Sequence, residues 1–117
     1  ISVNDQHLKE LYNRALLFVY PSYYEGFGIP ILEAYTCNCP VALSQASCFP
    51  EIAENAAAYF DPFSVSSMAE AIKSVIYDEA ERTRLILAGK ERIKLYSWEK
   101  ATRQTELVYR KVAKAVF

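Results

Sequence analysis

Residues 21–33 read Pro21-Ser-Tyr-Tyr-Glu-Gly-Phe-Gly-Ile-Pro-Ile-Leu-Glu33, and two of the three glycines of the chain lie in the middle of this stretch. An apolar run, residues 16–20, precedes it, and a short apolar segment follows it. Glycine lets backbone N–H groups approach a ligand without a Cβ in the way, and Pro30 suits the start of a helix. The stretch therefore predicts a strand, a tight loop and a helix N-terminus that can bind an anion such as phosphate.

The segments around this stretch alternate between strand-like and helix-like patterns. Apolar runs predict short parallel strands at 16–20, 41–43 and 57–60, and we expect the first to be buried on both faces. Apolar spacing predicts helices at 4–14, 30–37, 64–78, 79–95 and from 97 onward, and a single helical turn at 50–55. The expected capping residues are Asn4 or Asp5, Ser64 and Ser97. The predicted fold class is α/β, with a partial Rossmann-like parallel sheet of about three strands, flanking helices on both faces and a helical C-terminus.

Composition indicates a globular protein rather than a membrane-spanning one. The 117 residues are 52% hydrophobic and 23% charged, and no apolar run approaches membrane-spanning length. Because the first residue is not methionine and a helical pattern begins almost at once, we interpret the chain as a piece of a longer protein. The three cysteines are odd in number and lack zinc-type spacing, which argues against a disulfide framework and a metal site and fits a reducing cytosol.

The net charge of −1 conceals an asymmetry along the chain. Residues 1–78 carry three basic and nine acidic residues, whereas residues 79–117 carry ten basic and five acidic residues. The basic part can represent solvated helix faces, pairing with a domain outside this sequence, or a surface attracted to an anionic membrane. Alternation of the basic residues with glutamates favours solvated faces. A nucleic-acid partner is not expected, because no basic patch is interleaved with aromatic residues.

Glu25 and Glu33 flank the glycines and are separated by seven residues. Glu25 is expected on the loop and Glu33 about one turn into the helix, so both can face one cleft. Carboxylates accept hydrogen bonds from the vicinal hydroxyls of a sugar or a ribose, and the nearby N–H groups suit phosphate, so a sugar nucleotide would use both. The structural alternative, a turn cap at Glu25 and a helix-stabilising charge at Glu33, stays open on these grounds. A dehydrogenase fragment is disfavoured, because the third glycine of G-x-G-x-x-G is missing.

Residues 15–44 resemble the E-x7-E region of retaining glycosyltransferases of the GT-B fold, in particular the "group 1" family (glycosyltransferase family 4). The similarity continues, in the same order, through Phe49-Pro-Glu51, residues 56–62, residues 69–72 and Tyr96-Ser-Trp98. The resemblance implies that residues 1–117 form a single, incomplete nucleotide-sugar-binding domain, the C-terminal half of a GT-B donor-binding domain.

The resemblance also assigns roles to residues of the loop. It implies that Glu25 contacts hydroxyls of the donor sugar as the candidate catalytic residue, and that Glu33 binds the ribose hydroxyls. Ser44 and Ser47 would line the next loop and are weaker candidates. Trp98 and the last helix are expected to cover the sheet and, as in the family, to cross back towards the other domain. The donor-binding residues implied are Glu25, Gly26, Phe27, Gly28, Ile29, Glu33 and Ser44.

By the same resemblance, the parent protein is expected to be a retaining hexosyl-type transferase that uses a nucleotide-diphosphate sugar without a metal or another cofactor. The acceptor is expected to be a saccharide or a lipid-linked glycan, and the segment alone is expected to be inactive, since the acceptor-binding domain is not in this sequence. The expected localisation is cytoplasmic, and peripheral attachment to the inner face of a membrane is left open. The alternative function is a non-catalytic binding or assembly module that self-associates through an exposed sheet edge.

Overall fold

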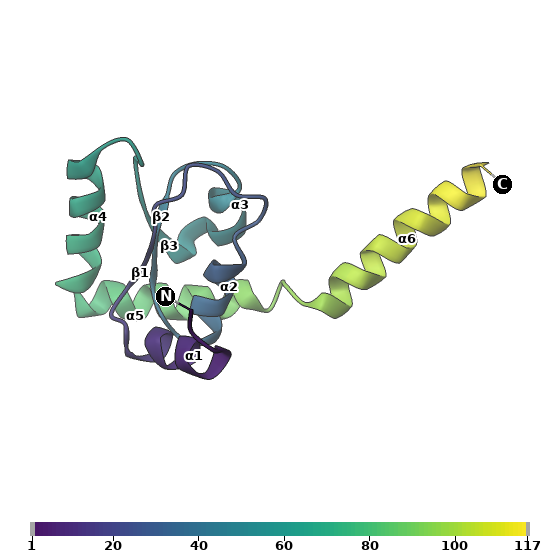
Figure 1. Ribbon diagram of the computed structural model, residues 1–117. Coiled ribbons are helices and arrows are strands. Elements are labelled where there is room, and N and C mark those ends of the chain that lie inside the picture. The colour runs from purple at the N-terminus through teal and green to yellow at the C-terminus, as the bar shows by residue number, and fades with distance from the viewer. Residues whose placement is uncertain (1, 117) are drawn as a thin grey trace.

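A three-stranded parallel sheet lies at the centre of the fold in the computed structural model, which describes residues 2–116 (Figure 1). Its strands are β1 (Phe18–Tyr20), β2 (Val41–Ser44) and β3 (Ala57–Phe60), in the order β1-β2-β3. Both pairings are parallel. The predicted α/β fold class is confirmed.

Helices connect and follow the strands much as the sequence predicts. The side chains of Asn4, Ser64 and Ser97 accept the N-terminal capping hydrogen bonds that the sequence suggests for three of these helices. Pro30 occupies the second position of its helix, where no intrahelical N–H bond is lost. The elements are α1 (Asp5–Arg14), α2 (Ile29–Thr36), α3 (Phe49–Ala53), the 3-10 helix η1 (Glu54–Ala56), α4 (Val65–Ile76), α5 (Glu79–Ile93) and α6 (Trp98–Val116).

Both faces of the central strand β2 are covered, so every residue of β2 is buried. On one face, Val41 and Leu43 belong to a core that α1, α2, α3 and η1 build, with residues of α5 against it. On the other face, Ala42 and Phe60 contact residues of α4, including Ala71. The alternation follows from the strand period of two residues. Helices therefore cover both faces, as predicted.

The first predicted strand is shorter and less buried than expected. It begins at Phe18 rather than at residue 16, and Leu16 is 61% exposed. The residues of β1 are half-buried, so the prediction of a strand buried on both faces is wrong for the described residues. The reason is position: β1 lies at an edge of the described sheet, whereas β2 lies between two neighbours.

The prediction that the last helix covers the sheet is also wrong. Helix α6 extends away from the rest of the described chain (Figure 1), and none of its residues is buried. Trp98, at its start, is 81% exposed. Among residues 2–116, no helix combines the length and the apolar character that a membrane crossing requires.

Charges in the last third of the chain are largely paired within helices. Four glutamates each form an ion pair with a basic residue three or four positions further on, an arrangement that stabilises a helix locally. These pairs are Glu81–Arg84, Glu91–Lys94, Glu99–Arg103 and Glu106–Arg110. The alternation in sequence therefore reflects solvated helix faces, the interpretation favoured above.

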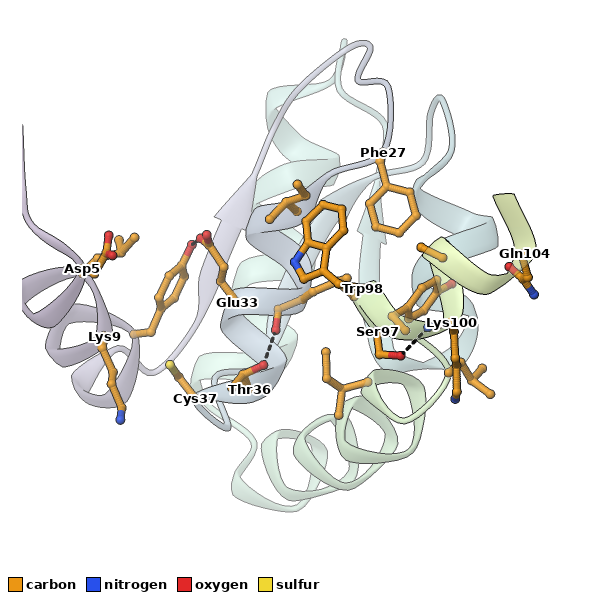
Figure 2. Close-up of a pocket in the computed structure, with 18 residues that line it drawn as sticks. Asp5, Lys9, Phe27, Glu33, Thr36, Cys37, Ser97, Trp98, Lys100 and Gln104 are labelled. Atoms are coloured by element: carbon orange, nitrogen blue, oxygen red, sulfur yellow. Dashed lines mark hydrogen bonds between the residues drawn. The ribbon is translucent and has the colours of Figure 1, made fainter. Parts of the chain in front are cut away.

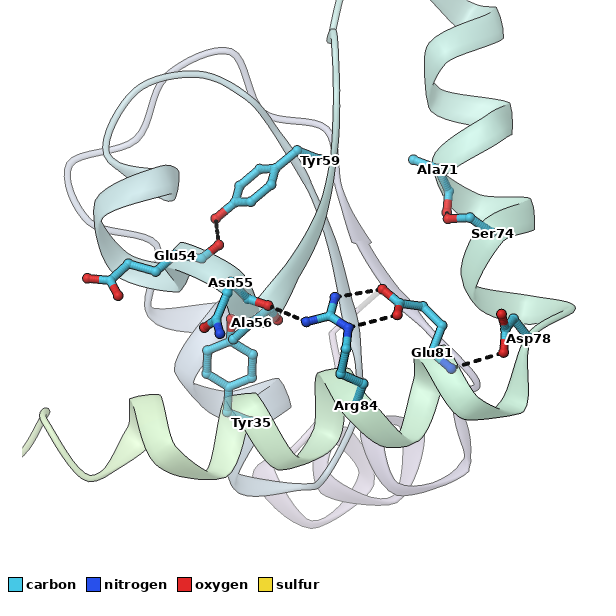
Figure 3. Close-up of polar contacts among 10 residues, drawn as sticks. All are labelled: Tyr35, Glu54, Asn55, Ala56, Tyr59, Ala71, Ser74, Asp78, Glu81 and Arg84. Atoms are coloured by element: carbon cyan, nitrogen blue, oxygen red, sulfur yellow. Dashed lines mark hydrogen bonds and ion pairs between the residues drawn. The ribbon is translucent and has the colours of Figure 1, made fainter.

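Three arginines of α5 satisfy carbonyl groups at the ends of other elements. The last carbonyl groups of a helix lack intrahelical donors, so guanidinium groups complete their hydrogen bonding. Arg82 donates to Val75 and Ile76 in α4, Arg84 donates to Asn55 in η1, and Arg92 donates to Glu51 and Ile52 in α3 (Figure 3 shows Arg84). The Arg84 guanidinium also lowers the pKa of Glu81. Helix α5 thus holds three other elements in place.

Helix α5 approaches α2 at a glycine. A Cβ atom on Gly89 would lie 2.6 Å from Cδ1 of Tyr35, far closer than side chains tolerate. Tyr35 is buried, and its hydroxyl donates to the carbonyl of Ala56 at 3.1 Å, so its ring cannot retreat without breaking that bond (Figure 3). The distance between α2 and α5 therefore depends on glycine at position 89.

We predict that Gly89→Ala destabilises the protein by about 1–3 kcal/mol, because overpacking displaces the Tyr35 ring. In an exposed helix the same substitution would raise the free energy of unfolding by about 0.5–1 kcal/mol. A decrease in the free energy of unfolding therefore distinguishes the close contact from ordinary helix propensity. Thermal and urea unfolding of the purified variant measure it.

Gly26→Ala is the matched control, because a Cβ at Gly26 has no atom within 4 Å. Its unfolding free energy is expected to change by less than about 0.5 kcal/mol. A Gly89→Ala variant as stable as the unmodified protein would contradict the close contact.

Candidate functional site

The loop between β1 and α2 needs glycine at position 28 for two reasons. Gly28 is the residue that precedes α2, and its φ of 100° lies in the left-handed region that disfavours other residues. A Cβ there would also lie 3.0 Å from both the Ile31 and the Phe49 side chains. Glycine therefore lets the loop turn sharply into the helix.

The turn leaves backbone donors free at the start of α2. Within residues 2–116, the N–H groups of Gly26, Phe27 and Gly28 have no hydrogen-bond partner, whereas the N–H of Glu25 donates to Ser47. The N-terminus of α2 adds partial positive charge next to these groups. This arrangement can bind an anionic group such as phosphate.

The following loop, residues 45–48, holds this backbone in place. The hydroxyl of Ser47 accepts from the N–H of Glu25 at 3.2 Å and donates to the carbonyl of Glu25 at 2.9 Å. The thiol of Cys48 donates to the carbonyl of Phe27 at 3.1 Å. Ser47 itself has a φ of 55°. Ser47, expected only to line the loop, and Cys48 therefore shape the glycine-containing turn, and nothing in their local sequence indicates that role.

Glu25 is half-buried within the turn. Its carboxylate accepts a hydrogen bond from the hydroxyl of Ser22 at 2.9 Å, and that hydroxyl also lies 3.1 Å from the carbonyl of Tyr24. Burial, followed by the neighbouring Glu25 carboxylate, raises the pKa of Tyr20 to about 12. Tyr20 therefore stays protonated at neutral pH, and Glu25 stands between two hydroxyl-bearing side chains.

Glu33 lies on α2, one turn beyond the loop. Its Oε2 atom accepts a hydrogen bond from the hydroxyl of Tyr12 at 3.2 Å. Tyr12 belongs to α1 and is 8% exposed. The sequence pattern gives no signal for this contact of Tyr12, because it joins residues 21 positions apart and only the folded chain brings α1 beside α2.

Glu33 lines a largely apolar groove of about 990 Å³ (Figure 2). The groove runs between α1, α2 and the first turns of α6, with Phe27 and Tyr96 on its wall. Phe27 meets Tyr96 edge to face, with ring centroids 5.5 Å apart. Glu25 does not line this groove. That both glutamates face one cleft stays a prediction.

Ser44 lies at the end of β2 with its side chain fully buried. Its Oγ atom has no hydrogen-bond partner within the described chain. The structure thus brings Glu25 and residues 26–29 together at the loop and places Glu33 one helical turn away, but it keeps the Ser44 side chain inside the protein. A donor-binding role for Ser44 stays a prediction.

The three cysteines are free thiols, and they lie at different depths. Cys39 is buried, and burial raises its pKa to about 11. Cys37 and Cys48 are half-buried. No group of three or more His, Cys, Asp or Glu side chains among residues 2–116 is arranged to hold a metal ion.

Comparison with known proteins places these features in a family. The family described as "Glycosyl transferases group 1" matches residues 2–92. O-antigen chain mannosyltransferase B of Escherichia coli is 40% identical over 108 residues, which are 92% of this chain and 28% of that protein. O-antigen chain mannosyltransferase RfbU of Salmonella typhimurium is 44% identical over 73 residues, 62% of this chain and 21% of that protein.

A solved structure shows the same arrangement of elements. Sucrose-phosphate synthase from Thermosynechococcus elongatus superposes with a TM-score of 0.85 at 30% sequence identity, covering 97% of this chain and 29% of that one. The chain thus spans less than a third of the length of these relatives. The chain belongs to the glycosyl transferases group 1 family.

Proposed function

We propose that this chain is the C-terminal part of the donor-binding domain of a retaining glycosyltransferase. The parent protein transfers a hexosyl group from a nucleotide-diphosphate sugar to a saccharide or a lipid-linked glycan. One observation carries the proposal: free N–H groups and two glutamates gather around the start of α2 in a chain of a glycosyltransferase family. Residues 1–117 are then one incomplete nucleotide-sugar-binding domain.

Each part of the loop has a role in this proposal. The N–H groups of residues 26–29 and the dipole of α2 bind the diphosphate and the sugar, and no metal ion is required. Glu33 accepts hydrogen bonds from the ribose hydroxyls. Glu25 contacts hydroxyls of the donor sugar and is the candidate catalytic residue, because it would hold that sugar as its bond to phosphate breaks. Its contact with Ser22 keeps the carboxylate in place for this.

Two relatives are named as mannosyltransferases, so a mannosyl donor is the first to assay. The relatives do not agree on the product, since the solved structure is a sucrose-phosphate synthase. The 117-residue segment alone is proposed to be inactive, because an acceptor must bind opposite the donor and closure over both is what commits the substrates to reaction.

Substitution of the two glutamates is predicted to have different effects on nucleotide binding and on kcat. In the protein at its natural length, Glu33→Ala is expected to weaken binding of both a nucleoside diphosphate and the corresponding nucleotide sugar by about 10- to 100-fold, the range for a lost charge-assisted hydrogen bond. Glu25→Ala is expected to leave nucleoside-diphosphate binding unchanged and to lower kcat by about tenfold or more. Calorimetric titration and steady-state kinetics measure these effects.

Glu70→Ala is the control for both variants, because Glu70 is an exposed carboxylate on α4. It is expected to change neither affinity nor kcat. If the unmodified protein and Glu33→Ala bind the nucleoside diphosphate with the same affinity, Glu33 has only a structural role.

Gly26→Ala tests the proposed approach of the donor to the backbone. A Cβ at position 26 projects into open space. The free energy of unfolding is therefore expected to stay unchanged, while the added methyl group occupies part of the proposed donor site. We expect KM for the nucleotide sugar to rise about tenfold, equivalent to about 1.4 kcal/mol. Unchanged KM would mean that the donor does not contact the turn at this glycine.

The alternative function, a self-associating binding module, is favoured by two observations. Strand β1 lies at an edge of the described sheet, and no residue of α6 is buried. An edge strand can pair with a second copy. Light scattering separates the two functions: a monomer that binds a nucleotide sugar supports the transferase, and an oligomer without such binding supports the module.

A further inference from the structure

One buried hydroxyl outside the loop contacts the glutamate to which ribose binding is assigned above. The Tyr12 hydroxyl on α1 donates to Oε2 of Glu33 at 3.2 Å, and both residues line the groove. The Tyr12 ring is held edge to face against Phe18 of β1, with centroids 5.3 Å apart and planes at 79°. Packing in the core therefore fixes the Tyr12 ring and, with it, the place of the hydroxyl.

We propose that Tyr12 is a positioning residue for donor binding: it holds the Glu33 carboxylate so that its remaining acceptor sites meet the two hydroxyls of the ribose. This inference rests on the proposed function of Glu33. It extends the site from the E-x7-E loop to α1, a helix that precedes that loop in the chain.

The proposal follows from the flexibility of glutamate. A free glutamate side chain loses about 1–2 kcal/mol of conformational entropy when it is fixed. If the fold has already fixed it, ligand binding does not bear that cost. A buried tyrosine is well suited to the task, because its aromatic ring is immobilised while its hydroxyl reaches a polar partner.

The Glu33 carboxylate also has enough acceptor sites to bind Tyr12 and two ribose hydroxyls at once. An ionised carboxylate has about four lone-pair sites, and Tyr12 uses one of them. Oε1 of Glu33 has no hydrogen-bond partner within residues 2–116, and Glu33 borders the groove. Two hydroxyl donors can therefore still bind. Burial and the Glu33 charge raise the pKa of Tyr12 well above its ordinary value, so its hydroxyl remains a donor at neutral pH.

The experiment is a double-substitution cycle in the protein at its natural length. Tyr12→Phe removes only the hydroxyl and retains the ring. We expect the dissociation constant for the nucleoside diphosphate and KM for the nucleotide sugar to rise about fivefold, the effect of one net hydrogen bond, with kcat nearly unchanged. In a Glu33→Ala background, Tyr12→Phe is expected to have no further effect on affinity.

A second readout uses the ligand. A 2′-deoxy nucleoside diphosphate lacks one of the hydroxyls that Glu33 would bind, so the unmodified protein is expected to bind it more weakly than the ribose form. Tyr12→Phe is expected to reduce this discrimination, and Glu33→Ala to abolish it. A purely structural role for Tyr12 would not change the ratio of the two dissociation constants.

Tyr35→Phe is the matched control. It also removes a buried tyrosine hydroxyl, here one that donates to the carbonyl of Ala56, but it lies outside the groove. It is expected to lower the melting temperature without changing the dissociation constant.

The possible results are distinct. If Glu33→Ala weakens binding and Tyr12→Phe does not, or if the two substitutions act additively, the positioning role is wrong and the role of Glu33 stands. If Glu33→Ala leaves nucleotide binding unchanged, the proposed function of Glu33 fails, and this inference fails with it.

Discussion

The contact between Tyr35 and Gly89 sets the geometry on which the rest of the structure depends. It fixes how closely α5 lies under α2, and the Tyr35 hydroxyl ties the same helix to the carbonyl of Ala56 just before β3. Helix α2 carries Glu33 and begins at the glycine-containing turn. A larger residue at position 89 would therefore move the helix that organises the candidate site, and it would also disturb the arginines of α5 that complete the ends of α3, α4 and η1.

The candidate site is held by supports from outside its own loop. Ser47 and Cys48 bind the backbone of residues 25–27, and Tyr12 binds the carboxylate of Glu33. Within the described residues, the N–H groups of Gly26, Phe27 and Gly28 thus stay without a hydrogen-bond partner while the loop itself is held in place. Such preorganisation would favour the proposed binding of a diphosphate, because fixed dipoles stabilise charge without reorganising at the moment of binding.

Much of the fold and part of the site could be predicted from sequence. The apolar runs, the caps at Asn4, Ser64 and Ser97, and the glycines before Pro30 are local signals, and the corresponding strands, helices and turn appear as expected. Burial was harder to predict. An apolar run indicates a strand but not its place in the sheet, so β1 was expected to be more buried than it is. An amphipathic pattern indicates a helix but not its partner, so α6 was wrongly expected to cover the sheet.

The sequence by itself determined the parallel α/β order, the turn at Gly28 and the positions of the two glutamates, because each depends on residues close together in the chain. Only the tertiary structure decided which contacts support those glutamates. Those contacts join residues about twenty positions apart, and local propensity carries no information on them. They arise when burial of the core fixes the distances between elements, which is why Tyr12 and Ser47 emerge as supports only in the folded chain.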